Sequence, residues 1–74
     1  MVARLPVLSA REVIKALTKF GFVIVRQGGS HIHLWHEGKR VLVTVPNHPE
    51  LAKGTLLSIL RQAKLSREEL LDRL

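Results

Sequence analysis

The sequence predicts an α+β fold in which two main helices cover one face of a three-stranded antiparallel sheet. Three observations predict it. Capping patterns mark the starts of two helices, two short turns separate three consecutive β-type segments, and apolar residues at helical spacing return after the third segment. A chain of 74 residues has room for one domain, so we expect residues 1–74 to form a single unit that ends in a short helix.

The first helix is predicted to begin after Ser9 and to end at Phe20. Ser9 and Glu12 fit a capping box, in which the hydroxyl accepts a hydrogen bond from the N3 amide and the carboxylate accepts one from the N-cap amide. Gly21 stands where a left-handed residue commonly ends a helix. The apolar residues at helical spacing, which form the expected buried stripe, are Val13, Ile14, Leu17 and Phe20.

Three strands joined by turns are predicted to follow the first helix. β-Branched and aromatic residues fill the first segment, and turn-forming residues separate the segments. Two tight turns in succession predict an antiparallel meander. The expected strands are Phe22–Arg26, His31–His36 and Arg40–Val45, the last ending at Pro46, and the expected turns are Gln27–Ser30 and Glu37–Lys39.

The second strand carries different chemistry on its two faces. Side chains alternate along a strand, so Ile32 and Leu34 point one way, whereas His31, His33 and Trp35 point the other. A sheet this small is covered on one side only, and we expect both main helices on the side of Ile32 and Leu34. The face with the histidines is therefore expected to stay open to solvent or to a partner.

The second main helix is predicted within Leu51–Ala63, after a loop at Asn47–Pro49. Its start is expected near Lys53–Thr55, and its apolar residues recur at helical spacing. The short final helix opens on a second capping box and then presents apolar side chains. The residues of this box are Ser66 and Glu69, and the apolar residues are Leu70, Leu71 and Leu74.

Charge is the strongest signal in the composition. Lys and Arg total 12 against 6 for Asp and Glu, which gives a net charge of +6. A basic excess of this size indicates an anionic partner, most often nucleic acid and sometimes an acidic protein. The plainer interpretation is a solvated surface on which like charges prevent association.

The composition also excludes several classes of protein. Cysteine is absent, which excludes disulfide scaffolds, thiolate zinc sites and thiol catalysis. A core this small cannot enclose a dinucleotide, flavin or haem, so we expect no organic cofactor. No stretch approaches the ~20 apolar residues of a membrane span, and the first residues lack the apolar segment of a signal peptide. We therefore expect a cytoplasmic protein with no membrane partner.

Three of the four histidines fall within the second strand, and a metal site is the first chemistry to test. His31 and His33 share a strand face, and such a pair can chelate Zn²⁺ or Ni²⁺. No carboxylate stands near as a third ligand, since Glu37 is beyond the strand and His36 points to the opposite face. We therefore expect no physiological metal.

Acid/base catalysis on RNA needs fewer residues than a metal site. RNA carries its own nucleophile, the 2′-hydroxyl, so cleavage requires a base, an acid and stabilisation of charge on the phosphorus centre. Histidine suits the proton transfers because its ordinary pKa of about 6.5 is close to working pH. His31 follows Gly28, Gly29 and Ser30, a loop that can bring backbone close to a phosphate. The alternative for His31 is a surface strand residue without a role.

Basic and aromatic residues elsewhere also allow two interpretations. Lys53 at a helix N-terminus offers a cation beside free amides, which suits a phosphate but is also ordinary helix geometry. Arg26, like Lys39 and Arg40, lies around the meander, either along an RNA backbone or simply in solvent. Trp35 could stack on a base, contact a protein partner or cover the sheet.

An ordered set of short motifs resembles the HicA-like (YcfA-like) family of mRNA interferase toxins. Gly29-Ser30-His31 after a helix and a strand is the first block, and a weak signal alone. The resemblance extends from Ser9 to Leu71 without large gaps. Its further blocks are Val43–Pro46, His48, Lys53–Leu56, Ile59-Leu60 and Ala63–Ser66.

The resemblance implies more than the residues show by themselves. It implies a fold like the double-stranded-RNA-binding domain, with α-β-β-β-α order, and a single HicA-like domain. It implies that His31 is the catalytic residue of an endoribonuclease, with Gly29 and Ser30 beside it. It also implies a type II toxin–antitoxin pair in which a HicB-like antitoxin binds the toxin and neutralises it. His33 and His36 are additional to the family motif, so a second catalytic histidine stays an open question.

The expected activity is metal-independent cleavage of mRNA. His31 would act as base or acid and leave a 2′,3′-cyclic phosphate, while Ser30 and the backbone of Gly28 and Gly29 position the phosphate. Arg26 or Lys53 would neutralise its charge. Two other classes remain: an RNA-binding module without catalysis, and a protein-interaction domain whose open sheet edge pairs with another chain.

Overall fold

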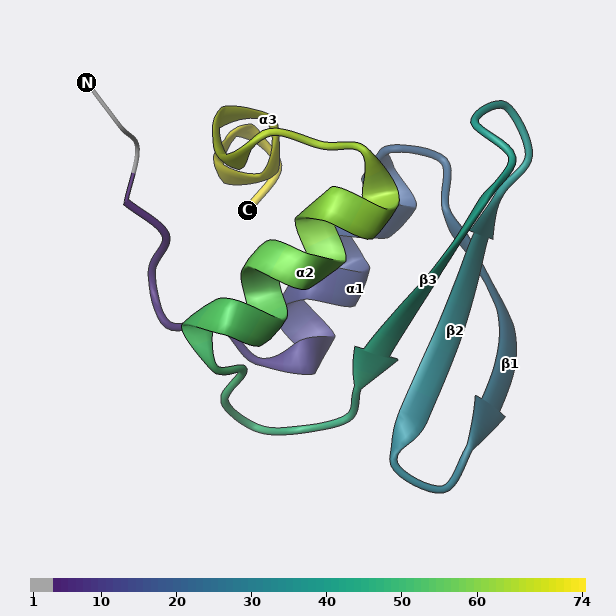
Figure 1. The fold of residues 1–74 in the computed structure, drawn as a ribbon, viewed down its shortest axis with the longest axis horizontal. Helices are drawn as coiled ribbons and strands as arrows, with labels where there is room; N and C mark the ends of the chain where they lie inside the picture. Colours follow the sequence, from purple (N-terminus) through teal and green to yellow (C-terminus); the bar gives the residue numbers. More distant parts are fainter. Residues whose placement is uncertain (1–3) are drawn as a thin grey trace.

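The computed structural model describes residues 4–74, which form an open three-stranded antiparallel sheet with its helices on one side (Figure 1). This is the predicted α+β fold, in the α-β-β-β-α order of a double-stranded-RNA-binding domain followed by a short helix. Its elements are α1 (Ala10–Lys19), β1 (Val23–Gly28), β2 (His31–His36), β3 (Val41–Pro46), α2 (Lys53–Ala63) and α3 (Arg67–Asp72).

The core lies between the sheet and the two main helices. β2 pairs with β3 so that Ile32 faces Val45 and Leu34 faces Val43, and all four side chains are buried. α2 packs against β3, and both main helices contribute apolar side chains to the same core. No charged or polar side chain of residues 4–74 is buried, so the interior is held by apolar packing alone. The helix-supplied core residues include Val13, Ala16, Leu17, Leu56, Ile59, Leu60 and Ala63.

Capping fixes both ends of α1 as predicted. The backbone N–H of Glu12 donates to Oγ of Ser9 at 3.1 Å, and the N–H of Ser9 donates to Oε1 of Glu12 at 3.0 Å. Phe20 is the C-cap, and Gly21 follows with a φ of +97°. Few residues other than glycine adopt this conformation, which turns the chain from the helix into β1.

The ends of β1 and β3 differ from the prediction. β1 begins at Val23 rather than at Phe22. β1 extends through Gln27 and Gly28, because these residues pair with Ile32 and His31 of β2, and the turn shrinks to two residues. β3 begins one residue later than expected. Arg40 belongs to the preceding turn, where its φ is +58° and its N–H donates to the carbonyl oxygen of His36.

β1 is the least covered strand of the sheet. All of its residues are exposed, although Ile24 and Gln27 pair with the buried Leu34 and Ile32 of β2. The register shifts between Ile24 and Arg26, which is a β-bulge at an edge strand. The helices therefore cover β2 and β3 more completely than β1.

Hydrogen bonds hold the loop between β3 and α2 in place. The N–H of Asn47 donates to the carbonyl oxygen of Ser30 at 2.7 Å, which ties the loop to the β1–β2 turn. The N–H of Ala10 donates to the carbonyl oxygen of His48 at 3.0 Å, which ties the same loop to α1. This segment is therefore anchored on both sides before α2 begins.

α2 and α3 are bounded by different devices. α2 starts after Ala52 without a side-chain cap and ends at Lys64 in the left-handed conformation. Nζ of Lys39 donates to the carbonyl oxygens of Ala63 and Lys64, so the β2–β3 turn closes the end of this helix. α3 opens on the predicted capping box. Within residues 4–74 no helix has the length and apolar character needed to cross a membrane.

Candidate active site

His31 is the first residue of β2 and follows directly on a tight two-residue turn. Gly28 and His31 face each other across this turn, and Gly29 has a φ of +56°. A positive φ at the first of two turn residues is the requirement of a type II′ hairpin, which glycine meets without strain. The turn therefore fixes the backbone of His31 while its side chain stays exposed.

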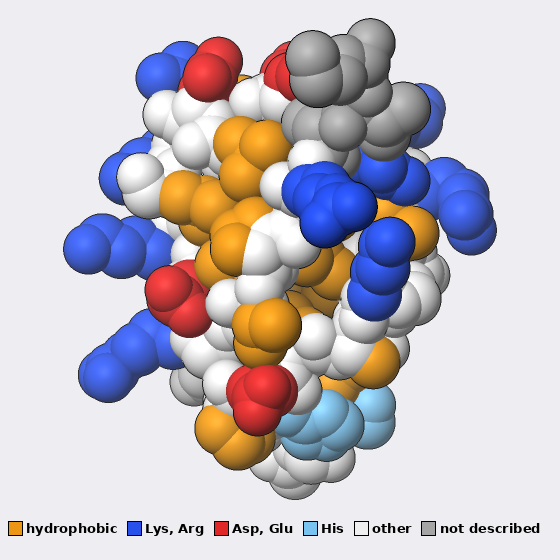
Figure 2. All heavy atoms as spheres, turned by 90° about the vertical axis from the view of Figure 1, so that its left-hand side faces the viewer, with side chains coloured by type: hydrophobic (Ala, Val, Ile, Leu, Met, Phe, Trp, Pro, Cys, Tyr) orange, Lys and Arg blue, Asp and Glu red, His pale blue; other side chains and the backbone are white. Residues whose placement is uncertain are grey.

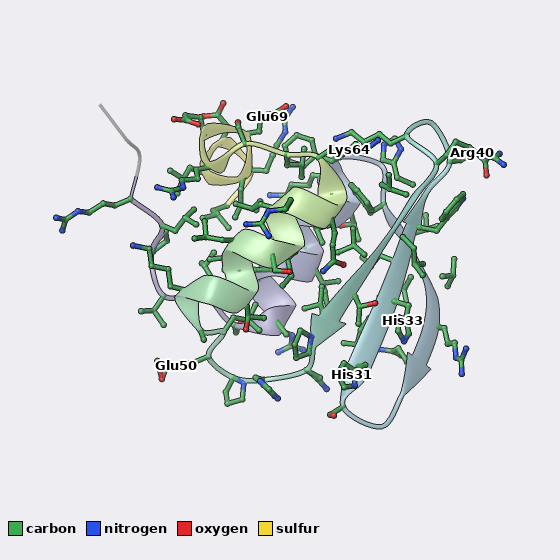
Figure 3. The ribbon with its side chains drawn as sticks, in the orientation of Figure 1. His31, His33, Arg40, Glu50, Lys64 and Glu69 are labelled. Carbon is green, nitrogen blue, oxygen red and sulfur yellow. The ribbon has the colours of Figure 1, made fainter. Side chains whose placement is uncertain are left out.

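The position of His31 in the sheet is seen in Figure 3. His31 and His33 follow each other along β2, at the end of the sheet that leads toward α2, and Arg40 is at the opposite end. His33 pairs with Thr44 of β3 and with Arg26 of β1. The expected grouping of His31 and His33 on one face, away from Ile32 and Leu34, agrees with the burial of the latter two.

A groove of about 400 Å³ lies beside His31, between β3 and α2. The prediction treated the histidine face as an open sheet surface, and the structure adds a second wall to it. That wall is one face of α2, formed by residues that recur every three or four positions along the helix. The lining residues are His31, Thr44, Pro46, Gly54, Thr55, Ser58, Ile59 and Gln62.

A chain of hydrogen bonds links the two walls of the groove. Nδ1 of His33 and Oγ1 of Thr44 share a hydrogen bond of 2.9 Å. The N–H of Thr44 donates to Oε1 of Gln62 at 3.0 Å, and Nε2 of Gln62 donates to Oγ of Ser58 at 3.3 Å. The side chain of Gln62 is thus oriented by bonds at both of its polar atoms.

Sequence reasoning missed Thr44, Ser58 and Gln62. The available signal was the spacing of Thr55, Ser58 and Gln62, which places three uncharged polar side chains on one face of the helix. That spacing does not show which side of the sheet this face meets. The contact depends on how α2 lies against the edge of β3.

The predicted cations take different positions around the sheet. Arg26 pairs with His33 in register and so lies on the histidine face. Lys53 is the first residue of α2, immediately before Gly54 and Thr55 of the groove. Nζ of Lys39 donates a hydrogen bond to the carbonyl oxygen of Ala63 at the end of α2, and Arg40 forms a 2.7 Å ion pair with Glu37. Arg26 and Lys53 are therefore the predicted cations nearest in the fold to the groove.

Trp35 is held at the far end of the histidine face. Its Nε1 donates to Oε1 of Glu37 at 3.0 Å, and the guanidinium of Arg40 lies 5.8 Å from the centre of the ring. These contacts use both its polar and its aromatic character within the β2–β3 hairpin. Because Trp35 is far along the strand from His31, it is not part of the groove.

His36 stabilises the fold and points away from the histidine face, as expected. The N–H of Lys39 donates to Nδ1 of His36, so the proton of the neutral ring is on Nε2, which donates to the carbonyl oxygen of Phe20 at 2.9 Å. The ring also contacts Phe22 edge to face, with 4.9 Å between centres. No group of three His, Asp or Glu side chains within residues 4–74 is placed to hold a metal ion.

The residues around the groove include groups whose chemistry suits proton transfer next to an anion. The exposed imidazole of His31 follows a tight turn, and the hydroxyl of Ser30 precedes it. The N-terminus of α2, which has no side-chain cap, supplies backbone amides across the groove. Arg26 and Lys53 supply positive charge nearby. These are the groups that cleavage of a phosphodiester by its own 2′-hydroxyl requires.

Comparison with protein families gives a match over residues 10–65, to the model described as the HicA toxin of bacterial toxin–antitoxin systems. The matched segment begins with α1, ends after α2 and includes the β1–β2 turn and every residue that lines the groove. A search of curated proteins finds no match.

Proposed function

Since the chain belongs to the HicA toxin family, and is thereby a toxin with a cognate antitoxin, we propose that it is an mRNA endoribonuclease with His31 as its catalytic residue. The observation that carries the proposal is the location of His31. Its imidazole is exposed on a fixed hairpin at the mouth of a groove, within the segment that matches the family.

The proposed reaction uses the 2′-hydroxyl of the RNA as nucleophile. The 2′-oxygen forms a bond to phosphorus while the bond from phosphorus to the 5′-oxygen breaks, which leaves a 2′,3′-cyclic phosphate and a free 5′-hydroxyl. A base takes the proton of the 2′-hydroxyl, and an acid gives a proton to the departing 5′-oxygen. His31 performs one of these transfers. His33, on the same strand face, is a second imidazole close enough in the fold to be tested for the other.

The charge that develops on the phosphorus oxygens needs stabilisation. In this proposal the Ser30 hydroxyl and the backbone of Gly28 and Gly29 position the phosphate, and Arg26 or Lys53 neutralises it. Because the 2′-hydroxyl is the nucleophile, the mechanism needs no metal-bound water. Since mRNA is the substrate, the proposed site of action is the cytoplasm.

The proposed antitoxin is a HicB-like protein. Its partner surface would include the histidine face, because covering His31 prevents RNA from reaching the groove. The net charge of +6 on the whole chain favours an acidic partner as well as RNA.

The test compares RNA cleavage by the wild type and by His31→Ala, with EDTA present in both. Loss of a general acid or base reduces the rate by roughly 10²- to 10⁴-fold, so the variant should be nearly inactive while the wild type cleaves. His48→Ala is a matched control, because His48 is exposed in the β3–α2 loop and does not line the groove. Circular dichroism checks that each variant is folded.

Two results would contradict the proposal. A folded His31→Ala protein that cleaves RNA at the wild-type rate removes the catalytic role of His31. Absence of cleavage by the wild type, together with RNA binding that weakens with salt, supports a binding module without catalysis.

A further inference from the structure

No Lys, Arg, Asp or Glu side chain is among the described residues that line the groove beside His31. Its polar groups are the hydroxyls of Thr44, Thr55 and Ser58 and the amide of Gln62. Arg26 and Lys53 are outside its lining. A phosphate site is normally built with cations, so this composition fits a neutral ligand better than a second phosphate.

The groove also offers an apolar surface under its polar rim. Ile59 is buried, and Pro46 at the end of β3 is half-buried. A nucleobase has two apolar faces and a polar edge, so it can contact these side chains while its edge meets the hydroxyls and the amide. At about 400 Å³ the groove is within the range of roughly 300–1,000 Å³ found for small-ligand sites.

Gln62 is oriented to present a donor to such a ligand. Its Oε1 is occupied by the N–H of Thr44, and one hydrogen of Nε2 is directed to Ser58. The amide group of Gln62 therefore cannot rotate by half a turn, exchanging Oε1 and Nε2, without breaking the hydrogen bond from Thr44. Its remaining N–H offers a fixed donor, and fixed donors are what give hydrogen-bond recognition its selectivity.

We propose that this groove binds one nucleobase of the RNA, next to the phosphate that is cleaved at His31, and that Gln62 determines which base is accepted. This rests on the proposed ribonuclease activity and adds a sequence preference to it. The base would be unstacked from its neighbours, as in single-stranded RNA recognition generally, and its acceptor atoms would face Nε2 of Gln62. Ser58 holds Gln62 in position and offers its own hydroxyl to the same edge.

The test uses Gln62→Glu, which has almost the same shape as the native side chain. A carboxylate can still accept the N–H of Thr44, but it presents an acceptor where the amide presents a donor. Base preference should therefore fall or change, whereas a structural role for residue 62 would be preserved. Gln27→Glu makes the same change of charge on β1, at the opposite edge of the sheet, and should leave the preference intact.

Two measurements are made with each protein. Cleavage sites in a random RNA library are mapped by sequencing the new ends. Binding is measured with four short oligoribonucleotides that differ at one base, using His31→Ala as background so that the RNA stays intact. We expect the wild-type groove to favour one base by roughly 10- to 100-fold, the discrimination that a good pair of hydrogen bonds to a base gives. Gln62→Glu should remove most of it, and Ser58→Ala part of it.

The outcomes separate this proposal from the ribonuclease proposal. Cleavage without base preference, or with a preference that both Gln62→Glu and Ser58→Ala keep, overturns the base-binding groove and leaves the ribonuclease standing. Base-selective binding that depends on Gln62 without any cleavage supports the groove and overturns the ribonuclease. Neither cleavage nor selective binding overturns both.

Discussion

The three histidines of β2 have different surroundings because of their positions along one strand. His31 is exposed at the groove, His33 shares a hydrogen bond with Thr44, and His36 is held between the Lys39 amide and the Phe20 carbonyl. Alternation of side chains explains the division, since His36 falls on the opposite face from the other two. One residue type thus serves both the proposed chemistry and the packing of a single strand.

The contact between His36 and Gly21 gives a prediction at the residue scale. A Cβ at Gly21 would lie 3.2 Å from Nε2 of His36, and the φ of +97° is one that alanine rarely adopts. Gly21→Ala should lower the free energy of unfolding by about 2 kcal/mol, from backbone strain and displacement of the ring. A thermal melt should show a decrease in Tm of roughly 8–16 °C.

Gly28→Ala is the control for this prediction. Nothing lies within 4 Å of a Cβ at Gly28, and its φ is not positive, so its Tm should stay close to that of the wild type. If Gly21→Ala and Gly28→Ala melt at the same temperature, the inference that position 21 requires glycine is wrong.

At the scale of the elements, the helices differ in how their ends are held. α1 and α3 each have a reciprocal capping box, whereas α2 begins without one. In α3 the carboxylate of Glu69 accepts hydrogen bonds from Ser66, first from the backbone N–H at 2.8 Å and then from the hydroxyl. These bonds favour the charged form and lower the pKa of Glu69 below its ordinary value of 4.5.

The lowered pKa predicts a loss of stability in acid. A carboxyl group whose pKa is lower in the folded chain stabilises the fold above its unfolded pKa, and this contribution disappears as pH falls through the folded pKa. Glu69→Gln has no such titration, so its urea midpoint should fall less than that of the wild type as pH decreases below 4.5. Glu68→Gln, outside the capping box, should behave as the wild type. An equal decrease in the urea midpoint of the wild type and of Glu69→Gln would show that this capping box does not contribute to the loss of stability in acid.

The sequence predicts the helices and strands well where the signals that end them lie within a few residues. The two capping boxes, Gly21 and the short turns act within a few residues, so they could be read without knowing the fold. The boundaries that were wrong depend on pairing. Gln27 and Gly28 became part of β1 because β2 supplies partners for them, and Arg40 left β3 because the turn requires a residue at positive φ.

The candidate site could be predicted in part. His31 and its turn are contiguous in sequence, and the alternation of β2 places His33 on the same face. The groove was not predictable, because its walls are Thr44 of β3 and a stripe of α2 that includes Ser58 and Gln62. These residues meet only when α2 lies along the edge of the sheet, a placement that depends on the packing of the whole core.

On the scale of the whole molecule, positive charge is spread over much of the surface. Figure 2 shows the side away from the sheet, where Lys and Arg side chains stand along both margins and hydrophobic side chains lie between them. The excess of 12 Lys and Arg over 6 Asp and Glu is therefore not confined to the histidine face. A net charge of this kind attracts a polyanion from any direction, and the proposed contact of RNA at the groove is a separate, local property.

The salt dependence of RNA affinity distinguishes phosphate contacts made by particular cations from attraction by the overall charge. If Arg26 and Lys53 each contact one phosphate, replacing either with alanine should reduce the slope of log K against log salt by roughly 0.7. The measurement is fluorescence anisotropy with a short RNA from about 50 to 200 mM salt, in the His31→Ala background. Lys15→Ala removes the same charge from α1, and its slope should change little. An equal change for Lys15→Ala would mean that the cations act as a diffuse charge.

The hydrogen bond between the carbonyl oxygen of Ser30 and the N–H of Asn47 has a consequence for affinity. It joins the hairpin that carries His31 to the loop that leads into α2, and Pro46 and Pro49 restrict the backbone of that loop. Both walls of the groove are thus preorganised before RNA arrives. The protein loses little conformational entropy on binding, and the entropic penalty falls on the RNA, which must give up base stacking and backbone freedom to enter. If the proposed ribonuclease function holds, unpaired and weakly stacked segments of a message are therefore the substrates that this preorganised site would favour.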